Sequence, residues 1–225
     1  MINRTVAGWL AVALCFGVIV SPADVSAREV EMPDKEYKLL DTFEAHQLAK
    51  ADKLFNDKAY RAAAAGYDTF ILDFPRSDAV SYALLRLARC LHLEEKRFQA
   101  IKRYNEVLDY FPNDILYAGA ALYYIGQCHW QNGDVEQAMK AWAEMAEDED
   151  YSRHYLAAGA INQLAENLQK QGRHDQAVAY FKQVGIDFRR SNDDAAREAM
   201  WKVIPHYVKQ QPDESKLRAF YAEVQ

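Results

Sequence analysis

The sequence predicts an all-α protein, an α-solenoid of about five stacked antiparallel helix pairs forming a single domain over residues 28–225. Three observations support this fold class. An alanine followed four residues later by an aromatic residue recurs four times, a small residue lies twelve positions before each of these alanines, and turn-forming residues separate the helices of most pairs. Self-similarity at a fixed period of this size is typical of helix-pair repeats that stack on one another.

The central motif places the alanine and the aromatic residue one helical turn apart. Successive alanines are 37, 38 and 39 residues apart. Small residues on both helices of a pair let the two backbones approach closely, and the aromatic residue fills the space toward the next pair. The four sets are Ala51, Ala63 and Tyr67; Ala88, Ala100 and Tyr104; Gly126, Ala138 and Trp142; and Ala165, Ala177 and Phe181.

A chain reversal is expected between the two helices of each pair. Glycine or asparagine occurs in three of these turns, at 56–58, 132–134 and 171–173, whereas Glu94-Glu95-Lys96 has neither. Pro75 and Pro112 should end the second helices of the first two repeats, because proline has no N–H to donate and clashes with the preceding turn. Helices are therefore expected near residues 35–57, 60–74, 78–93, 97–111, 115–131, 134–147, 153–170, 174–188, 194–210 and 213–223.

The C-terminal part of the array is less regular. The acidic stretch from Ala146 to Tyr151 replaces the helix-ending proline of the third repeat, and we interpret it as a solvated loop because it lacks the ligand spacing of a calcium loop. Pro205 falls inside the ninth helix and should kink it. The last helix should cap the exposed end of the core with one apolar stripe, formed by Leu217, Phe220, Tyr221 and Val224.

The repeated residues resemble the signature of the tetratricopeptide repeat (TPR) family, in which Leu-Gly, a later Ala-x-x-x-Phe and a terminal proline recur. Leu87-Ala88, Ile125-Gly126 and Leu164-Ala165 are similar to the first of these elements. The resemblance covers about 140 residues. It implies a right-handed superhelix of helix pairs, and a protein that binds other proteins rather than an enzyme.

Two repeat ends resemble a narrower group of proteins. The stretches from Tyr67 to Pro75 and from Tyr104 to Pro112 share an aromatic, two apolar residues and a final Phe-Pro. They are similar to the repeat ends of bacterial envelope TPR proteins, of the beta-barrel assembly lipoprotein and Tol-Pal coordinator type. This resemblance implies a protein-binding role in the envelope of a bacterium with two membranes.

The first 27 residues have the order of a secretory signal peptide. Arg4 precedes an apolar run over residues 6–20, and the small residues Val25-Ser26-Ala27 suit cleavage before Arg28. A cut after Ala23 and an uncleaved anchor are the alternatives, although the run is shorter than the ~20 residues that a spanning helix needs. Cys15 follows Leu14 and lies inside the apolar run, so we interpret it as part of the signal and not as a lipidation site. The mature protein should then be periplasmic or secreted, and could associate peripherally with the outer membrane.

No motif in the sequence indicates catalysis, a cofactor or a metal ion. The formal net charge of −6 argues against nucleic acid as the main partner, because phosphate binding needs a basic face. The six histidines form no His-Glu-x-x-His, and there is no glycine-rich phosphate loop and no Gly-x-Ser-x-Gly. We interpret His92 and His129 as groove or surface residues on first helices.

Two cysteines remain after the signal peptide, and both occupy the same place in their repeats. Cys90 and Cys128 each lie two residues after the small residue of a first helix. Equivalent points in stacked repeats are about one helix diameter apart, roughly 10 Å. A disulfide needs Cα atoms within about 7 Å. We therefore favour two buried free thiols, with a disulfide as the alternative.

The first helices of TPR pairs line a concave groove, and a protein or peptide ligand would lie there. Aromatic side chains supply contact area in such a groove, and arginine and amide groups bind backbone or carboxylate groups. Tyr123 and Trp130 could instead be core between repeats, and the arginines could be solvated. The partner-binding candidates implied by the register are Tyr82, Arg86 and Arg89 in the second repeat, Tyr123, Tyr124, Gln127 and Trp130 in the third, and Asn162, Gln163 and Glu166 in the fourth.

The two arginines are not expected to belong to the core, because long charged side chains are seldom fully buried unless they are paired. Replacing Arg86 and Arg89 with alanine should therefore leave stability almost unchanged. Three functions compete for such a protein. It could be an exported scaffold or adaptor that binds an extended segment of a partner, a structural subunit of an envelope assembly complex, or an accessory module of a cell-wall enzyme.

We predict that the mature protein begins at Arg28, because the small residues before it form a cleavage site and Cys15 lacks the context for lipidation. N-terminal sequencing of the protein from envelope fractions measures this directly. Recovery of chains with residues 1–27 intact, or with an acylated Cys15, would contradict it.

Overall fold

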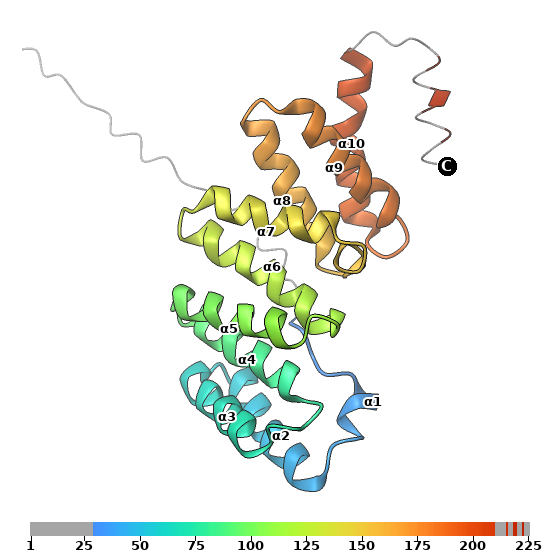
Figure 1. Cartoon of the computed structure of the whole chain (residues 1–225). Coiled ribbons are helices and arrows are strands. Elements are labelled where there is room, and N and C mark those ends of the chain that lie inside the picture. Colours follow the sequence, from blue (N-terminus) through green and yellow to red (C-terminus); the bar gives the residue numbers. More distant parts are fainter. Residues whose placement is uncertain (1–28, 210–214, 216–217, 220–221, 223–225) are drawn as a thin grey trace, which may run out of the picture.

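The computed structural model describes residues 29–209, 215, 218, 219 and 222, and every regular element within them is a helix. Figure 1 shows these helices stacked in chain order from α2 to α10. Their bounds are α1 Asp34–Tyr37, α2 Thr42–Asn56, α3 Tyr60–Asp73, α4 Val80–Leu93, α5 Arg97–Tyr110, α6 Ile115–Gln131, α7 Val135–Glu147, the short 3₁₀ helix η1 Tyr151–Arg153, α8 Ala157–Lys170, α9 His174–Asp187 and α10 Asp193–Lys209.

Each helix packs mainly on the one before it and the one after it. The pairs are α2 with α3, α4 with α5, α6 with α7 and α8 with α9, and α10 packs on α9 as the first helix of a fifth pair. Successive first helices also contact one another, α4 with α6, α6 with α8 and α8 with α10. They approach more closely than successive second helices do, so the first helices lie on the inner side of the stack. The predicted all-α solenoid is confirmed.

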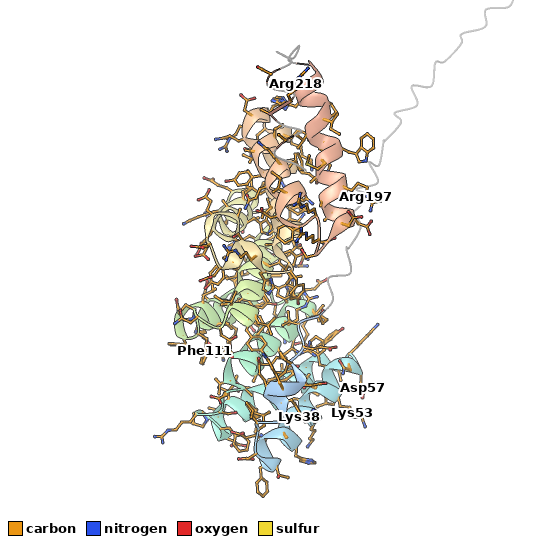
Figure 2. All side chains as sticks on the ribbon, turned by 90° about the vertical axis from the view of Figure 1, so that its right-hand side faces the viewer. Lys38, Lys53, Asp57, Phe111, Arg197 and Arg218 are labelled. Atoms are coloured by element: carbon orange, nitrogen blue, oxygen red, sulfur yellow. The ribbon has the colours of Figure 1, made fainter. Side chains whose placement is uncertain are left out.

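The predicted repeat register is confirmed by burial. All four motif alanines, the four aromatic residues that follow them and the four small residues of the first helices are buried. Figure 2 shows the side chains along the whole stack, with Lys53 and Asp57 of the first pair at one end and Arg197 of α10 toward the other. The core is therefore a continuous column between the two layers of helices and has no single centre.

The closest approach within a pair occurs in the third repeat. A Cβ atom added to Gly126 of α6 would come within 2.1 Å of Nε1 of Trp142 on α7. That distance is far inside van der Waals contact, so only glycine leaves room for the indole ring. In the first repeat, a Cβ on Gly66 of α3 would meet Cβ of Ala51 on α2 at 3.1 Å. Small residues on one helix thus receive the neighbouring helix directly.

The four turns within pairs share one conformation. The residue five positions before each motif alanine has a positive φ: Lys58 (59°), Glu95 (61°), Gly133 (84°) and Gly172 (77°). In each turn the next residue donates its N–H to a carbonyl five residues earlier, at 2.9 Å. This is the hydrogen bond that closes a helix C-terminus around a left-handed residue. The turns at 57–59 and 94–96 therefore form without the glycine that the third and fourth turns have at this position.

The first predicted helix, 35–57, is wrong at its start, because the chain breaks between α1 and α2. Asp41 accepts hydrogen bonds from the backbone N–H groups of Phe43 and Glu44, at 2.7 and 2.9 Å. The Glu44 carboxylate in turn accepts from the Asp41 N–H at 3.0 Å. This reciprocal capping box begins a new helix at Thr42 and separates it from the four-residue α1.

The acidic loop after α7 follows the expectation. The acidic residues 147–150 are exposed, and Asp148 accepts hydrogen bonds from two backbone N–H groups at the start of η1. Pro205 lies inside α10, and its predicted kink stays a prediction. Residues 215, 218, 219 and 222 of the predicted last helix are helical, and the rest of that stretch, with its apolar stripe, lies outside the described residues. The predicted signal peptide also lies outside them.

Cys90 and Cys128 are free and buried, as predicted. Burial raises the pKa of each thiol to about 12, so both stay protonated and unreactive at neutral pH. No helix within the described part of the chain is long and apolar enough to cross a membrane.

We predict that Glu95→Gly stabilises the protein by about 0.5–1 kcal/mol. The left-handed conformation costs a non-glycine residue about 1–2 kcal/mol, which exceeds the roughly 0.4–1 kcal/mol of chain entropy that glycine adds to the unfolded state. Chemical denaturation measures the change. Glu94→Gly is the matched control, because Glu94 has a φ of −84° and should lose stability. Equal effects of the two substitutions would contradict this account of the turn.

Candidate protein-binding groove

The ten predicted partner-binding residues all lie on the first helices α4, α6 and α8, which form the inner side of the stack. Their burial divides them into two groups. Tyr82, Arg86 and Tyr124 are buried between repeats, whereas the other seven are half-buried. The groove candidates are thus partly structural, and the accessible part runs along α6 and α8.

Tyr82 and Tyr124 pack the first helices against their neighbours. The Tyr82 hydroxyl donates to Asp52 Oδ1 of α2 at 2.8 Å, and its ring lies 5.6 Å from the ring of Tyr117 on α6. Tyr124 stacks on Tyr104 of α5 with the ring centroids 5.5 Å apart. Tyr82 and Tyr124 are each only 2% exposed to solvent. Their expected role as ligand contacts is therefore secondary to a role in holding the repeats together.

Arg86 is buried, contrary to the expectation that both arginines are dispensable to the core. Its guanidinium lies 3.6 Å above the ring of Phe55, and Nε is 3.9 Å from Asp52 Oδ1 and 3.3 Å from the Tyr67 hydroxyl. Burial raises the pKa of Tyr67 and Tyr82, so both hydroxyls stay protonated and donate to Asp52. Long charged side chains are seldom fully buried unless they are paired, and Arg86 is paired with Asp52.

Arg89 binds a carboxylate from outside the repeats. Residues 29–33, which we call the N-terminal arm, precede α1 and run beside α4 (Figure 1). Glu29 of the arm accepts hydrogen bonds from Arg89 Nε at 3.0 and 3.1 Å and from Nη2 at 2.7 Å. The next residue, Val30, is buried, and its carbonyl accepts from Arg86 Nη1 at 3.4 Å. The two predicted groove arginines thus contact the protein's own N-terminal segment.

His92 is buried and is not the groove or surface residue that we expected. Its Nε2 faces Oε1 of Gln131 at 3.0 Å, and its Nδ1 faces Arg89. Burial, followed by the charge of Arg89, lowers the pKa of His92 to about 4. Burial likewise lowers the pKa of His154 to about 4, and His154 contacts the Leu116 carbonyl at 3.1 Å. Both rings stay neutral between pH 5 and 8, so neither changes charge in the physiological range.

The accessible strip on α6 and α8 combines aromatic rings with amides. Gln127 donates to the Tyr123 hydroxyl at 3.2 Å, and the Trp130 ring lies 6.0 Å from that of Trp142. Asn162 Oδ1 is buried without a hydrogen-bond partner among the described residues. Gln163 lies beside it in sequence and is half-buried. Amides and rings in this arrangement can bind the backbone of an extended chain.

The far end of the strip is already occupied by an internal pair. Glu166 of α8 accepts from Lys202 Nζ of α10 at 2.6 Å, and Lys202 also lies 5.0 Å from the ring of Phe181. Glu166 therefore joins two repeats as Asp52 does at the other end. Within the described ranges, no cluster of three or more His, Cys, Asp or Glu residues could hold a metal ion.

Comparisons with known proteins agree with this architecture. Residues 96–152 and 163–191 match sequence models of the tetratricopeptide repeat. A solved structure of nearly identical TPR-like repeats, from a Podosopora anserina protein described as a kinesin light chain, is 15% identical. The match covers 86% of this chain and 99% of that one, with a TM-score of 0.52. A variant of the same repeats is 14% identical over 85% and 97%, with a TM-score of 0.51.

No curated protein matches the chain in sequence. The sequence models show that the chain contains tetratricopeptide repeats, and the solved structures show the TPR-like solenoid fold.

We predict that Arg86→Ala lowers the free energy of unfolding by about 1–3 kcal/mol, because Asp52 and the Val30 carbonyl lose a buried donor. Thermal and chemical denaturation measure the loss. Arg103→Ala is the control, because the Arg103 side chain is 40% exposed and its removal should change stability by no more than about 0.5 kcal/mol. If the two variants lose the same amount of stability, Arg86 is not part of the core.

Proposed function

We propose that this protein is a non-catalytic, exported scaffold of the bacterial cell envelope that holds an extended segment of a partner protein in the groove formed by α4, α6 and α8. The observation that carries the proposal is the N-terminal arm. Its residues contact α4 as a bound peptide would, with the Glu29 carboxylate and the Val30 carbonyl hydrogen-bonded and the Val30 side chain buried. Stacked repeats with tetratricopeptide matches are a fold that typically binds proteins.

The remaining groove has the chemistry for peptide binding and not for bond breaking. Amides and aromatic rings on α6 and α8 offer hydrogen bonds and contact area without a nucleophile beside a base. The two thiols are protonated, and the two buried histidines are held neutral by packing. These contacts support a role in recognition of a partner segment.

The envelope location rests on the sequence of the first 27 residues and on the two Phe-Pro repeat ends. The signal-like segment supports export, and the repeat ends resemble those of envelope TPR proteins. A structural subunit of an envelope complex is the second candidate. Exposed aromatic residues on second helices and at helix ends, such as Phe98 and Tyr110 of α5, favour it, because they could contact a neighbouring subunit.

Site-specific photocrosslinking in the native envelope tests the proposal. A benzoylphenylalanine at Gln163, in the open strip of α8, should form an adduct with one partner, and mass spectrometry of the adduct should map to one segment of it. The same group at Lys140, exposed on the second helix α7, should form none. An adduct from Lys140 with none from Gln163 would favour the structural-subunit role and contradict groove binding.

A further inference from the structure

The groove pairs its charged residues across neighbouring repeats, and Arg89 breaks that pattern. Asp52, Arg89 and Glu166 occupy equivalent positions, each directly after the small residue of its first helix. Asp52 faces Arg86 of the next first helix, and Glu166 faces Lys202 of the next. At the corresponding place, Arg89 faces Tyr124, whose ring lies 4.5 Å from the guanidinium. Among the described residues, the helix pairs thus give Arg89 an aromatic surface but no carboxylate.

Glu29 supplies the missing carboxylate, and it does so from outside the repeat array. The guanidinium binds it in a two-pronged arrangement, which is the strong and directional form of this contact. Two hydroxyls beside it, those of Tyr104 and Tyr124, are buried with no hydrogen-bond partner among the described residues. Neither hydroxyl binds Glu29, so the carboxylate is held by the Arg89 guanidinium, which also faces the Tyr124 ring. We call this place on Arg89 the acidic seat.

The arm has the contacts of a short peptide ligand. Glu29 fills the acidic seat, the Val30 side chain is buried, and the Val30 carbonyl accepts a hydrogen bond from Arg86. Glu31 is exposed and makes no ion pair with the described residues. The recognised element is therefore an acidic residue followed by a small branched apolar residue in an extended chain.

Beyond these contacts, Met32 of the arm and Tyr37 and Leu40 after it are half-buried against the core. Helix α1, which follows the arm, has no fully buried side chain. The segment is tied down further by the Tyr117 hydroxyl, which donates to Glu36 at 3.1 Å, and by the Tyr37 hydroxyl, which donates to the Ala45 carbonyl at 2.8 Å. The adjacent helices from α2 to α10 pack directly on one another. A segment that takes the place of the arm and buries an apolar side chain where Val30 lies therefore leaves those helix contacts unchanged.

We propose that the arm is an internal ligand of the groove, and that a partner segment with an acidic residue followed by a branched apolar residue binds the Arg86–Arg89 seat by displacing it. This rests on the proposed groove-binding function and adds the chemistry of the segment and its competitor. Tethering gives the arm a high local concentration. If the arm fills the seat in about nine molecules of ten, the apparent affinity for a competing segment falls about tenfold.

The test uses residues 28–225, the predicted mature chain, and a fluorescein-labelled peptide with the sequence of residues 28–37 as the probe. In one protein variant, Glu29→Gln and Val30→Ser together weaken the arm without shortening the chain. Fluorescence anisotropy should show the probe binding this variant about tenfold more tightly than the unaltered protein. Circular dichroism confirms that the variant keeps its helices. Adding Arg89→Ala to the variant should abolish the gain.

Two altered probes provide the matched control. A probe with Glu29→Gln should lose about tenfold or more in affinity, because it leaves the Arg89 seat unfilled. A probe with Glu31→Gln has the same change in charge and should bind as the unaltered probe does. Equal losses for both would mean that net charge alone drives binding, and would overturn the proposed seat.

Other results would also show whether the arm and a partner segment compete for the groove. Equal binding of the probe to the variant and to the unaltered protein would show that the arm does not compete for the groove. A concentration-dependent dimer of the unaltered protein that the arm variant lacks would make a second copy the occupant, and would overturn a partner segment. If Gln163 forms an adduct in the envelope but the probe does not bind, the proposed scaffold function stands and the proposal that the arm is an internal ligand is contradicted. If the probe binds but Gln163 forms no adduct, the arm is a ligand of the groove and the proposed scaffold function in the envelope is contradicted.

Discussion

The close approach of the two helices of a pair at their small residues is the constraint on which the rest of the structure depends. In the third repeat this approach is closest, because the Trp142 indole occupies the space that any side chain on Gly126 would need. In the first repeat Gly66 lies against Ala51, and the aromatic residues of the other repeats, Tyr67, Tyr104 and Phe181, are buried as Trp142 is. Because each pair is fixed in this way, the next pair must follow at a similar offset, and the first helices converge on the inner side.

That convergence produces the groove and also explains its chemistry. Residues directly after the small positions lie at the junction of two repeats, where they can reach the next first helix. Buried pairs such as Asp52 with Arg86 hold two repeats together, and their polar atoms are satisfied by tyrosine hydroxyls as well as by each other. Where the pattern lacks an acid, at Arg89, the chain fills the place with its own N-terminal arm. Structure and recognition thus use the same positions.

The repeat register could be predicted because its determinants are local and periodic. Ala138 and Trp142 are one helical turn apart, and the turn at Glu95 could be located from the register even without a glycine. The break before Thr42 was missed, because the capping box of Asp41 and Glu44 that makes it lies inside the stretch predicted as one helix, 35–57. The contact between Glu29 and Arg89 spans 60 residues and has no periodic signal. The burial of Arg86 likewise depends on partners from three separate segments, which composition and spacing do not reveal.

A double-mutant cycle between Gly126→Ala and Trp142→Phe tests the close contact between the two helices of a pair most directly. Gly126→Ala alone should lower stability by about 1–3 kcal/mol through overpacking, and most of that loss should disappear in the Trp142→Phe background, where the smaller ring leaves room. Gly159→Ala is the reference, because a Cβ there meets Tyr123 at an ordinary 3.6 Å and should stabilise α8 by up to about 1 kcal/mol. If Gly126→Ala behaves as Gly159→Ala does, or if its effect is the same with Phe at position 142, the close contact does not determine how the helix pairs are built.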